Sequence, residues 1–548
     1  MKKIIIAALA LLPMLAQAQT ANDAYTISQN DLKGTARYMS MAGAYSALGG
    51  DISSVSKNPG GIGVYRSSDI NLTLNVDIQS VESSTPVESS KRHQTDFICN
   101  NFGYVGAIKL KSDVVPFLNW GISYNRPMSL NRRYSGTISN INSSLSNYIA
   151  NLTNDYGYTS YDLAFEENGN DVIYDPYVDS NAPWLSIMGF NSYIINPSSI
   201  DVNGNESNFK GLMNPKTTGF SEFEVIEEGG IDQFDINFGG NVLDKFYWGF
   251  SLGLNSLNYT KYTYYGEALN NATVFSKYSG LTEGDASFGL ENWLSTSGFG
   301  TNFKVGVIYT PISQVRLGFA FHTPTYWTLT DECFSAINYE MSNYTDNHSY
   351  SGNEESNSGY IDEVTYKINT PWKINASVAT VLGTKAVLSF EYERVAYDDM
   401  KIEYRNRFGA YIEDKMVSNS IKDYYKGMDI FRVGAEYRLT PSVSLRAGYS
   451  YENSPMNESA LNNDIGIITS GTMPAYTFDK STQYFTGGVG FRAGGFYADL
   501  AYVHKLRQSE YHAFSSYADA DLNKWVDAPM SSIKDSNSQV VMSFGYRF

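Results

Sequence analysis

Residues 431–451 read FRVGAEYRLTPSVSLRAGYSY, and this stretch decides the fold. Apolar and aromatic residues occupy every second position on both sides of Thr440-Pro441, and mostly polar or small residues stand between them. A period of two is typical of a β-strand with one apolar and one polar face, because successive side chains point to opposite sides. The stretch therefore predicts two antiparallel strands joined by a tight turn at Thr440-Pro441.

The same pattern recurs along the chain and predicts fourteen strands. We expect them near 69–80, 94–110, 117–128, 231–243, 246–259, 298–310, 313–326, 362–380, 384–397, 427–439, 442–453, 482–493, 496–507 and 538–548. Connections after even-numbered strands are short. Those after odd-numbered strands are long, apart from a modest first one at 81–93; they include 260–297, 327–361 and the largest, about 130–230. An even number of strands whose connections are alternately short and long is typical of outer-membrane barrels. The sequence thus predicts an all-β, transmembrane antiparallel β-barrel of about fourteen strands over residues 69–548.

The composition favours a barrel over a soluble domain. Aromatic residues make up 14% of the chain, with 43 Tyr, and charged residues only 18%, below the ~25% of soluble domains. Tyr and Trp are favoured at both membrane interfaces, and strands that alternate between lipid and lumen do not stand out in averaged hydropathy. The net charge of −17 argues against a nucleic-acid partner, since phosphate binding needs a basic surface.

The beginning of the chain predicts export. Residues 1–18 read as a signal peptide, with Lys2 and Lys3, an apolar run from Ile4 to Leu15, and a small-x-small cleavage site at residues 16–18. The apolar run is too short to span a membrane as a helix. The mature chain is therefore expected to begin near Gln19.

The end of the chain predicts insertion into the outer membrane. Val540, Met542, Phe544, Tyr546 and Phe548 share one face of the last strand. This ending resembles the C-terminal signal that the barrel assembly machinery reads, so we expect that machinery as a partner in biogenesis and outer-membrane lipids as the surroundings. Both mature termini are expected on the periplasmic side.

The polar faces of the strands predict a charged lumen. Charges inside a barrel can pair or meet water, whereas a charge on the lipid face costs ~2–4 kcal/mol at the midplane. We expect most of them to brace the wall as ion pairs and a minority to line a ligand path. The lumen-facing candidates are Lys304, Arg316, His322, Glu391, Glu393 and Arg432.

Residues 19–68 differ in kind from the strands that follow. The part from Gly34 to Arg66 is rich in Gly, Ala and Ser and lacks the alternation of a strand. A fourteen-stranded barrel would otherwise enclose a wide lumen, so we interpret this segment as a plug. The alternative is a flexible periplasmic tail, which would leave several apolar side chains without packing.

This segment also carries a family resemblance. Ala36-Arg37, Met41-Ala42-Gly43-Ala44, Asp51 and Asn58-Pro59-Gly60-Gly61-Ile62 resemble the hatch of FadL-type outer-membrane transporters, the long-chain fatty acid and aromatic hydrocarbon transport proteins. Gly60 replaces the usual Ala, and Ala42-Gly43 replaces a double Gly. The resemblance implies hatch or gating roles for Arg37, Gly43, Asp51, Asn58, Pro59 and Gly60.

The resemblance also implies a function, namely passive uptake of hydrophobic small molecules. The ligand would meet an apolar groove among the external loops, enter the barrel and leave sideways past a kinked strand. Groove candidates in the largest loop are Trp184, Leu185, Ile187, Met188 and Phe190. The alternative is that these residues pack the loop against itself.

Other readings of the chain remain open at this stage. Some relatives serve as docking or shuttle subunits of protein secretion systems, and others are labelled haem receptors. The five His lack ligand spacing, so we expect no metal and no cofactor. The one Gly-x-Ser-x-Gly match, Gly249-Phe250-Ser251-Leu252-Gly253, lies inside the predicted strand 246–259 and not at a strand-to-helix turn, so we expect no enzyme and no catalytic residues. Cys99 and Cys333 are either bridged or two isolated thiols.

Overall fold

A computed structural model describes residues 20–548 except 86–87, 169–170, 201–205, 278–279, 346–348, 470 and 520–523. The predicted signal peptide at 1–18 lies outside the described residues. None of the described helices is long and apolar enough to cross a membrane. Cys99 and Cys333 are both free, so they are isolated thiols and form no bridge.

The chain forms a closed antiparallel β-barrel of fourteen strands, which confirms the predicted fold class. The barrel closes because β1 (Asp69–Ser84) pairs with β26 (Met530–Arg547) over its whole length. Four of the fourteen consist of two shorter strands in line. In order they are β1, β2 (Ser89–Lys109), β3 (Phe117–Ser129) with β4 (Arg132–Ser139), β9 (Thr218–Val242), β10 (Phe246–Ser276), β11 (Gly280–Ile312), β12 (Val315–His322) with β13 (Tyr326–Asn343), β15 (Asp362–Asn369) with β16 (Lys373–Leu382), β17 (Ala386–Val395) with β18 (Lys401–Arg405), β20 (Met428–Arg438), β21 (Val443–Glu452), β22 (Tyr476–Ala493), β23 (Phe496–His512) and β26.

The strand faces follow the sequence period. On β10, Leu252 is 42% exposed on the outer face, whereas Ser251 is buried on the lumen face. Outward residues are apolar from Phe246 to Leu254, and beyond Leu254 they are polar, Tyr or small. Nine residues at ~3.3 Å each, tilted by about 40°, give a height near the ~25 Å apolar band of outer-membrane barrels.

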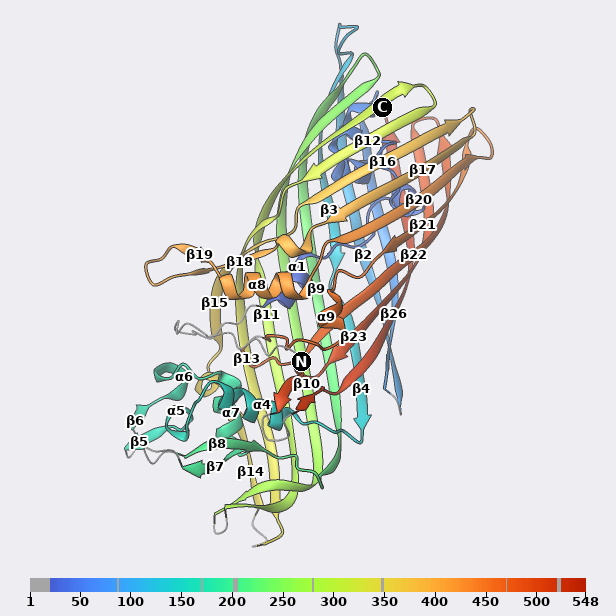
Figure 1. Ribbon diagram of the computed structural model, residues 1–548. Coiled ribbons are helices and arrows are strands. Elements are labelled where there is room, and N and C mark those ends of the chain that lie inside the picture. Colours follow the sequence, from blue (N-terminus) through green and yellow to red (C-terminus); the bar gives the residue numbers. More distant parts are fainter. Residues whose placement is uncertain are drawn as a thin grey trace.

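Several strands are longer than predicted. The stretches 260–297 and 327–361, which we expected to be loops, are mostly strand: β10 continues to Ser276, and β11 begins at Gly280. Outward residues beyond the apolar band are mostly polar, Tyr or small, with exceptions such as Phe299, so the apolar alternation ends although strand pairing continues. These extensions, with β14 (Ser349–Glu355), form the long sheet at the bottom of Figure 1.

Residues 140–217 form a cap at the end of the long connections, hereafter the outer end (Figure 1). A buried cluster joins the cap to the barrel extensions, for example Ile149 with Leu290. The cap contains α4 (Leu145–Asp155), α5 (Ser160–Leu163), β5 (Glu166–Asn168), β6 (Asp171–Tyr174), α6 (Pro176–Asp179), α7 (Trp184–Asn191), β7 (Ile195–Ile200) and β8 (Glu206–Gly211).

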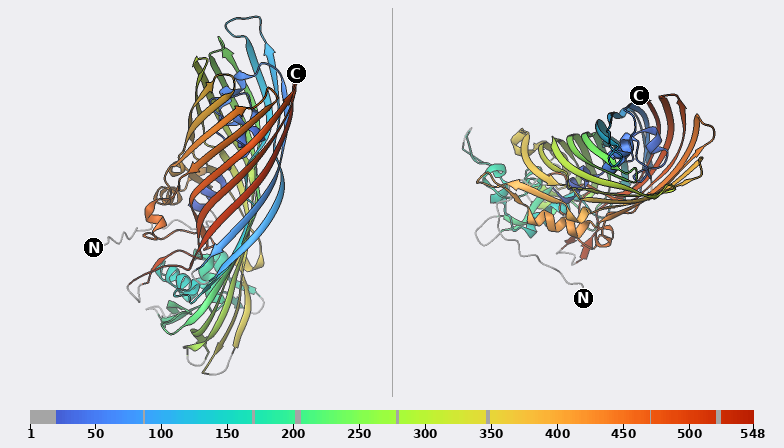
Figure 2. Two further views of the ribbon diagram at one scale, coloured as in Figure 1. Left: turned by 90° about the vertical axis from the view of Figure 1, so that its right-hand side faces the viewer. Right: turned by 90° about the horizontal axis from the view of Figure 1, so that it is seen from above.

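The N-terminal segment lies inside the barrel, as the view from above shows (Figure 2). Its elements are α1 (Ala21–Ser28), α2 (Ala36–Met39), α3 (Ile52–Lys57) and the 3-10 helix η1 (Pro59–Val64). Three packing clusters hold it, one around α1, one around Tyr38 to Leu48, and one that joins Ile52 to Tyr65 with Val105 of β2. The segment therefore fills the lumen as a plug, in agreement with the predicted fold class.

The two ends of the described chain lie at opposite ends of the barrel. Phe548 bonds to Ser68 at the end of the short turns, hereafter the inner end. Helix α1 instead packs on α8 (Lys415–Tyr424), which belongs to a long connection at the outer end. The expectation of two periplasmic termini therefore fails for the first described residues, because the segment threads the lumen from the outer to the inner end before β1 begins.

A buried carboxylate docks the cap on the barrel. Glu267 lies on β10 beyond the apolar band and accepts hydrogen bonds from the Leu145 backbone N–H (2.8 Å), the Ser144 hydroxyl and the Tyr265 hydroxyl. Burial raises the pKa of the Glu267 carboxyl to about 7. The Glu267 carboxyl therefore stays protonated up to a higher pH when the cap is docked than when the cap is undocked.

The lipid-facing pattern predicts the effect of a charge on β10. Leu252→Arg should lower the free energy of folding into bilayers by about 2–4 kcal/mol, because Leu252 lies within the apolar band. The measurement is a urea titration of folded, heat-modifiable protein. Asn258→Arg is the matched control, since Asn258 faces outward beyond the band. Equal losses for both variants would contradict the assigned membrane position.

The docking carboxylate predicts a pH dependence of the cap. Docking should weaken as pH rises from the ordinary value of 4.5 to about 7, since proton release is then favoured in the undocked state. Hydrogen exchange of α4, corrected for the intrinsic rate, should be on the order of fifty- to a hundredfold faster at pH 8 than at pH 5. In Glu267→Gln this difference should vanish. A wild-type cap with equal protection at both pH values would refute the assignment.

Candidate functional site

Asn58 ties the plug to the barrel wall. Its side-chain amide donates to the carbonyls of Ser46 (3.0 Å) and Val307 (3.1 Å), and its side-chain oxygen accepts from the Gly60 backbone N–H (3.0 Å). Asn58 is fully buried, and Pro59 begins η1, where a missing N–H costs nothing. One side chain thus joins two turns of the plug to β11.

Glycines on both sides make this close approach feasible. A Cβ on Gly60 would meet the Val307 backbone at 2.9 Å. A Cβ on Gly306 would overlap Asn58, and one on Gly249 would overlap the Pro59 carbonyl. The plug therefore abuts the backbone of β10 and β11 directly.

Two further motif residues shape the plug itself. Gly43 has a φ of +80°, in the left-handed region that favours glycine. Asp51 caps α3 by accepting from the Ser53 backbone N–H (3.0 Å), and it also accepts from the Thr35 hydroxyl (2.8 Å). Both residues therefore fix the path of the plug chain.

Ion pairs link the plug to the lumen face of the wall. Arg37 pairs with Glu436 (3.1 Å), and Lys57 pairs with Glu393 (3.5 Å). Arg316 donates to the Leu48 carbonyl at 2.6 Å. A buried ion pair gives little net stability but penalises any arrangement that separates it. The pairs therefore specify where the plug sits.

The other lumen candidates meet around the same plug. Arg432 bonds Glu391 (3.0 Å) and Glu393 (2.6 Å), and Glu391 also accepts from the Ser46 backbone N–H (3.1 Å). Lys304 pairs with Asp235 (3.1 Å). The His322 ring nitrogen Nε2 lies 2.7 Å from the Lys57 carbonyl and donates to it. All six predicted lumen-facing residues thus lie on the lumen side.

The wall has a gap in strand pairing beside the plug. The ladder between β2 and β3 ends at Asn101–Asn125, and a bulge follows between Asn125 and Met128. Beyond it, β2 pairs only with β1 among the described strands, while β4 pairs with β9. The Asn131 amide, which donates to Asp96 at 2.9 Å, spans the gap. Only side chains close the wall here.

Two polar cavities meet at this gap. The outer chamber, a cavity of about 60 Å³, is lined at the gap by Asp96 and residues 128–132. The inner chamber, a cavity of about 100 Å³, is lined at the gap by residues 125–127. Both are also lined by Gln29 and Asp31 of the plug segment. A molecule in either chamber therefore lies next to the gap.

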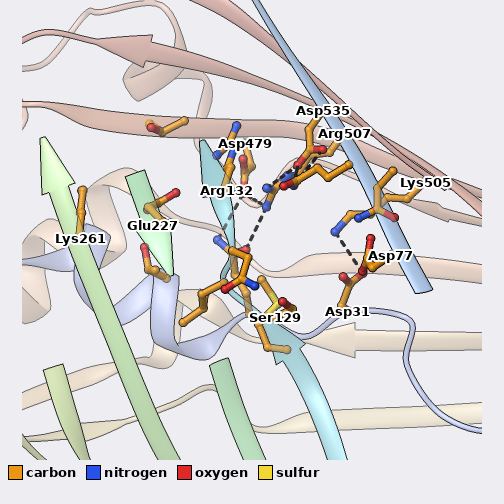
Figure 3. Close-up of a pocket in the computed structure, with 18 of the residues that line it drawn as sticks. Asp31, Asp77, Ser129, Arg132, Glu227, Lys261, Asp479, Lys505, Arg507 and Asp535 are labelled. Carbon is orange, nitrogen blue, oxygen red and sulfur yellow. Dashed lines mark hydrogen bonds and ion pairs between the residues drawn. The ribbon is translucent and has the colours of Figure 1, made fainter. Parts of the chain in front are cut away.

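Charged side chains line the outer chamber on opposite sides (Figure 3). Lys505 pairs with Asp31 (3.1 Å), and Arg507 pairs with Asp535 (2.9 Å). Glu227 and Lys261 face them from β9 and β10. Sequence reasoning missed this set, because its members lie hundreds of positions apart and only the alternation of β23 placed Lys505 and Arg507 on the lumen face.

The predicted external groove takes another form in the structure. Leu185, Ile187 and Met188 are buried in the core of the cap, and Trp184 and Phe190 are half-buried against it. The expectation that these five residues line an open groove is therefore wrong for the three buried ones. The short helix α7 is apolar on all sides, so it packs between α4 and the barrel extensions.

The comparisons with known proteins point to one family. The family described as "Outer membrane protein transport protein (OMPP1/FadL/TodX)" matches residues 238–468. Its description names a transport protein, in agreement with the prediction that the chain is no enzyme. No curated protein matches the chain.

Several solved structures align with nearly the whole chain. A Pseudomonas aeruginosa FadL homologue aligns with 12% identity and a TM-score of 0.49 over 95% of this chain and 100% of that chain. The Pseudomonas putida toluene transporter TodX aligns with 12% identity and a TM-score of 0.44 over 95% of this chain and 99% of that chain. The Ralstonia pickettii toluene transporter TbuX aligns with 15% identity and a TM-score of 0.41 over 94% of this chain and 99% of that chain.

The family match and the N-terminal motif come from separate parts of the chain. The motif lies within residues 36–62, and the matched residues begin at 238. Because the family match does not include the residues of the N-terminal motif, it is independent of that motif. The resemblance to FadL-type outer-membrane transporters is therefore confirmed.

Proposed function

We propose that the protein is an outer-membrane channel for passive uptake of hydrophobic small molecules, with a lateral exit beside the plug. The match to a family of outer-membrane transport proteins supports the location and the general role. The observation that carries the lateral exit is the pairing gap between β2 and the β3–β4 strand, with two cavities directly behind it.

The plug makes a sideways route more plausible than a straight one. Residues 46–64 lie directly on the wall at Gly249 and Gly306, and the Lys57–Glu393 ion pair and the hydrogen bonds of Asn58 hold them in place. A ligand that moved straight through would have to break these contacts. A ligand that leaves at the gap reaches lipid near Phe97 on β2, which is 72% exposed. An apolar group gains about 25 cal/mol per Å² by staying out of water.

The proposed hatch residues act on this route by fixing the plug. Asn58, Pro59 and Gly60 set its contact with β11, Arg37 holds its middle, and Gly43 and Asp51 set its turns. We also propose that residues 19–68 form one hatch unit and that the C-terminus faces the periplasm. No observation in the described part of the chain favours a secretion shuttle or a haem receptor.

Cross-linking the gap tests the lateral exit. In a Cys99→Ser, Cys333→Ser background, Asp96→Cys with Asn131→Cys should form a disulfide, since these side chains are hydrogen-bonded across the gap. Uptake of a hydrophobic probe into liposomes or cells should fall at least tenfold and return on reduction.

The matched control places the bridge where strands already pair. Thr330 and Thr365 are register partners on β13 and β15, with hydroxyls 3.0 Å apart. Thr330→Cys with Thr365→Cys should leave uptake unchanged. Full uptake through the cross-linked gap would eliminate the lateral exit.

Loosening the plug tests the hatch. Asn58→Ala with Pro59→Ala removes three hydrogen bonds of the plug, so uptake should change several-fold while barrel assembly, measured by heat-modifiability, stays normal. Arg66→Ala is the control, because its pair with Asp244 is exposed and such pairs contribute ~0–1 kcal/mol. Unchanged uptake at normal barrel levels would remove the gating role.

A further inference from the structure

A hairpin at residues 401–413, hereafter the side hairpin, projects from the barrel near the outer end. It consists of β18 and β19 (Tyr411–Glu413), which pair with each other. Only its base is attached to the wall, where Lys401 to Tyr404 pair with β15. Figure 1 shows the hairpin extending sideways, nearly across the direction of the long strands. Its tip, residues 406–410, lies away from the described strands of the wall.

The base of the side hairpin shares one row of paired residues with the edge of the apolar band. Lys401 pairs with Asn369, and Asn369 pairs with Tyr326 of β13. Tyr326 pairs with Thr301 of β11. Thr301 in turn pairs with Leu254, the last residue of the outward apolar run on β10. The side hairpin therefore leaves the wall close to the outer surface of the membrane.

Aromatic side chains mark the same level on the outer face of the wall. Phe299 of β11 is 75% exposed, and Tyr326 on the neighbouring β13 is exposed as well. Trp372 directly precedes β16, and its indole N–H donates to Asp399 at 2.6 Å, two residues before β18. Tyr and Trp are favoured at membrane interfaces. A hairpin that extends sideways from this level lies over the lipid head groups.

The tip of the side hairpin is a closed turn that presents an aromatic ring. The side-chain oxygen of Asn406 accepts hydrogen bonds from the backbone N–H groups of Phe408 (2.9 Å) and Ala410 (3.0 Å). Gly409 has a φ of +81°, in the left-handed region that favours glycine. Phe408 is 81% exposed, the highest value among the large apolar residues described, and Ile412 is exposed too. The turn thus holds an apolar ring outward, where an apolar partner would stabilise it.

The tip is also basic, although the chain as a whole carries −17. Residues 404–412 include Arg405 and Arg407 and no acidic residue. Both Arg side chains are exposed, and neither has an ion-pair partner among the residues that the structure describes. The Arg407 guanidinium lies over the Phe408 ring, 4.9 Å from its centroid. Positive charge and apolar surface therefore occur together at the tip.

A bilayer surface offers the complement of both. Lipid phosphates accept hydrogen bonds from guanidinium groups, often in pairs, and the acyl chains beneath them cover aromatic rings. The alternative partner is a second copy, whose outer wall exposes Glu332 and Glu340. These residues lie six and fourteen positions beyond Tyr326 on β13. Two barrels side by side in one membrane would therefore place the tip too close to the membrane to reach them.

We propose that the side hairpin docks on the membrane surface at the outer end, with Arg405 and Arg407 bound to lipid phosphates and Phe408 inserted beside them. The partner is thus an anionic lipid surface. The inference concerns a surface outside the lumen, so it goes beyond the proposed uptake function and does not depend on it.

Docking also fixes the outer end of the plug segment. Asp414 follows β19 directly and caps α8 by accepting from the Met416 backbone N–H (2.9 Å). Helix α8 packs on α1 of the plug segment. Tyr425, the residue after α8, stacks on Tyr25 of α1 with ring centroids 5.0 Å apart. The side hairpin therefore links the lipid surface to the plug through α8.

Fluorescence quenching by lipids with a nitroxide in the head group tests the position of the tip. The whole protein is placed in nanodiscs of phosphatidylcholine and phosphatidylglycerol. In a Cys99→Ser, Cys333→Ser background, Ala410→Cys carries the fluorophore at the tip. Ser351→Cys is the matched control, because Ser351 lies exposed on β14, far beyond the band. Quenching should be at least threefold stronger at Ala410 than at Ser351.

Charge and ring variants test the chemistry of docking. Arg405→Gln with Arg407→Gln should reduce quenching of the tip label at least threefold, and Phe408→Ser should reduce it as well. Arg405→Lys with Arg407→Lys should retain it, because the positive charge remains. Lys216→Gln with Lys277→Gln is the control, since it removes two exposed cations far from the tip. Barrel assembly is checked by heat-modifiability in each case.

Three results would overturn the inference. Equal quenching at Ala410 and Ser351 would place the tip in water. Unchanged quenching in correctly assembled Arg405→Gln with Arg407→Gln would remove the role of lipid phosphates. Tip quenching that appears only in discs with two barrels would make a second copy the partner.

Discussion

The structure depends on one constraint: inside the bilayer every backbone N–H and C=O must be paired, because lipid offers no hydrogen bonds. The pairing of β1 with β26 satisfies it by closing the wall. A gap in backbone pairing is tolerated only where side chains or water reach the freed groups. The gap beside β3 meets this condition, because Asn125, Asn131 and Asp96 line it at the outer edge of the apolar band.

The alternation that closes the barrel to lipid also fills its lumen with charge. Each strand that turns Leu252 or Phe390 outward must turn Ser251 or Glu391 inward. The plug balances many of these groups, so its position is specified by electrostatics as well as by packing. Glycines then bring its backbone against the wall, and the two chambers lie in space that remains between plug and wall.

The alternation of outward and inward faces explains which features could be predicted from the sequence and which could not. A period of two identifies strands and faces, so the fourteen strands and the lumen side of Lys304 and Glu393 were predictable. The period fades beyond the apolar band, because polar and apolar residues are mixed on both faces there: Thr263 and Leu290 both point inward. The outer extensions of β10 and β11 were therefore read as loops. Pairs such as Lys505 with Asp31 depend on the strand register across the barrel, which no local pattern encodes. The helix α7 is apolar on all sides, so its burial left no periodic signal in the sequence.

A polar interior and an apolar cargo are compatible only if the apolar part of the cargo spends little time in the lumen. The geometry allows this, because both chambers lie against the gap. In the proposed route, a ligand that reaches either chamber already lies next to the gap and close to the lipid near Phe97. The plug then blocks the straight path through the lumen, and the gap supplies the proposed exit.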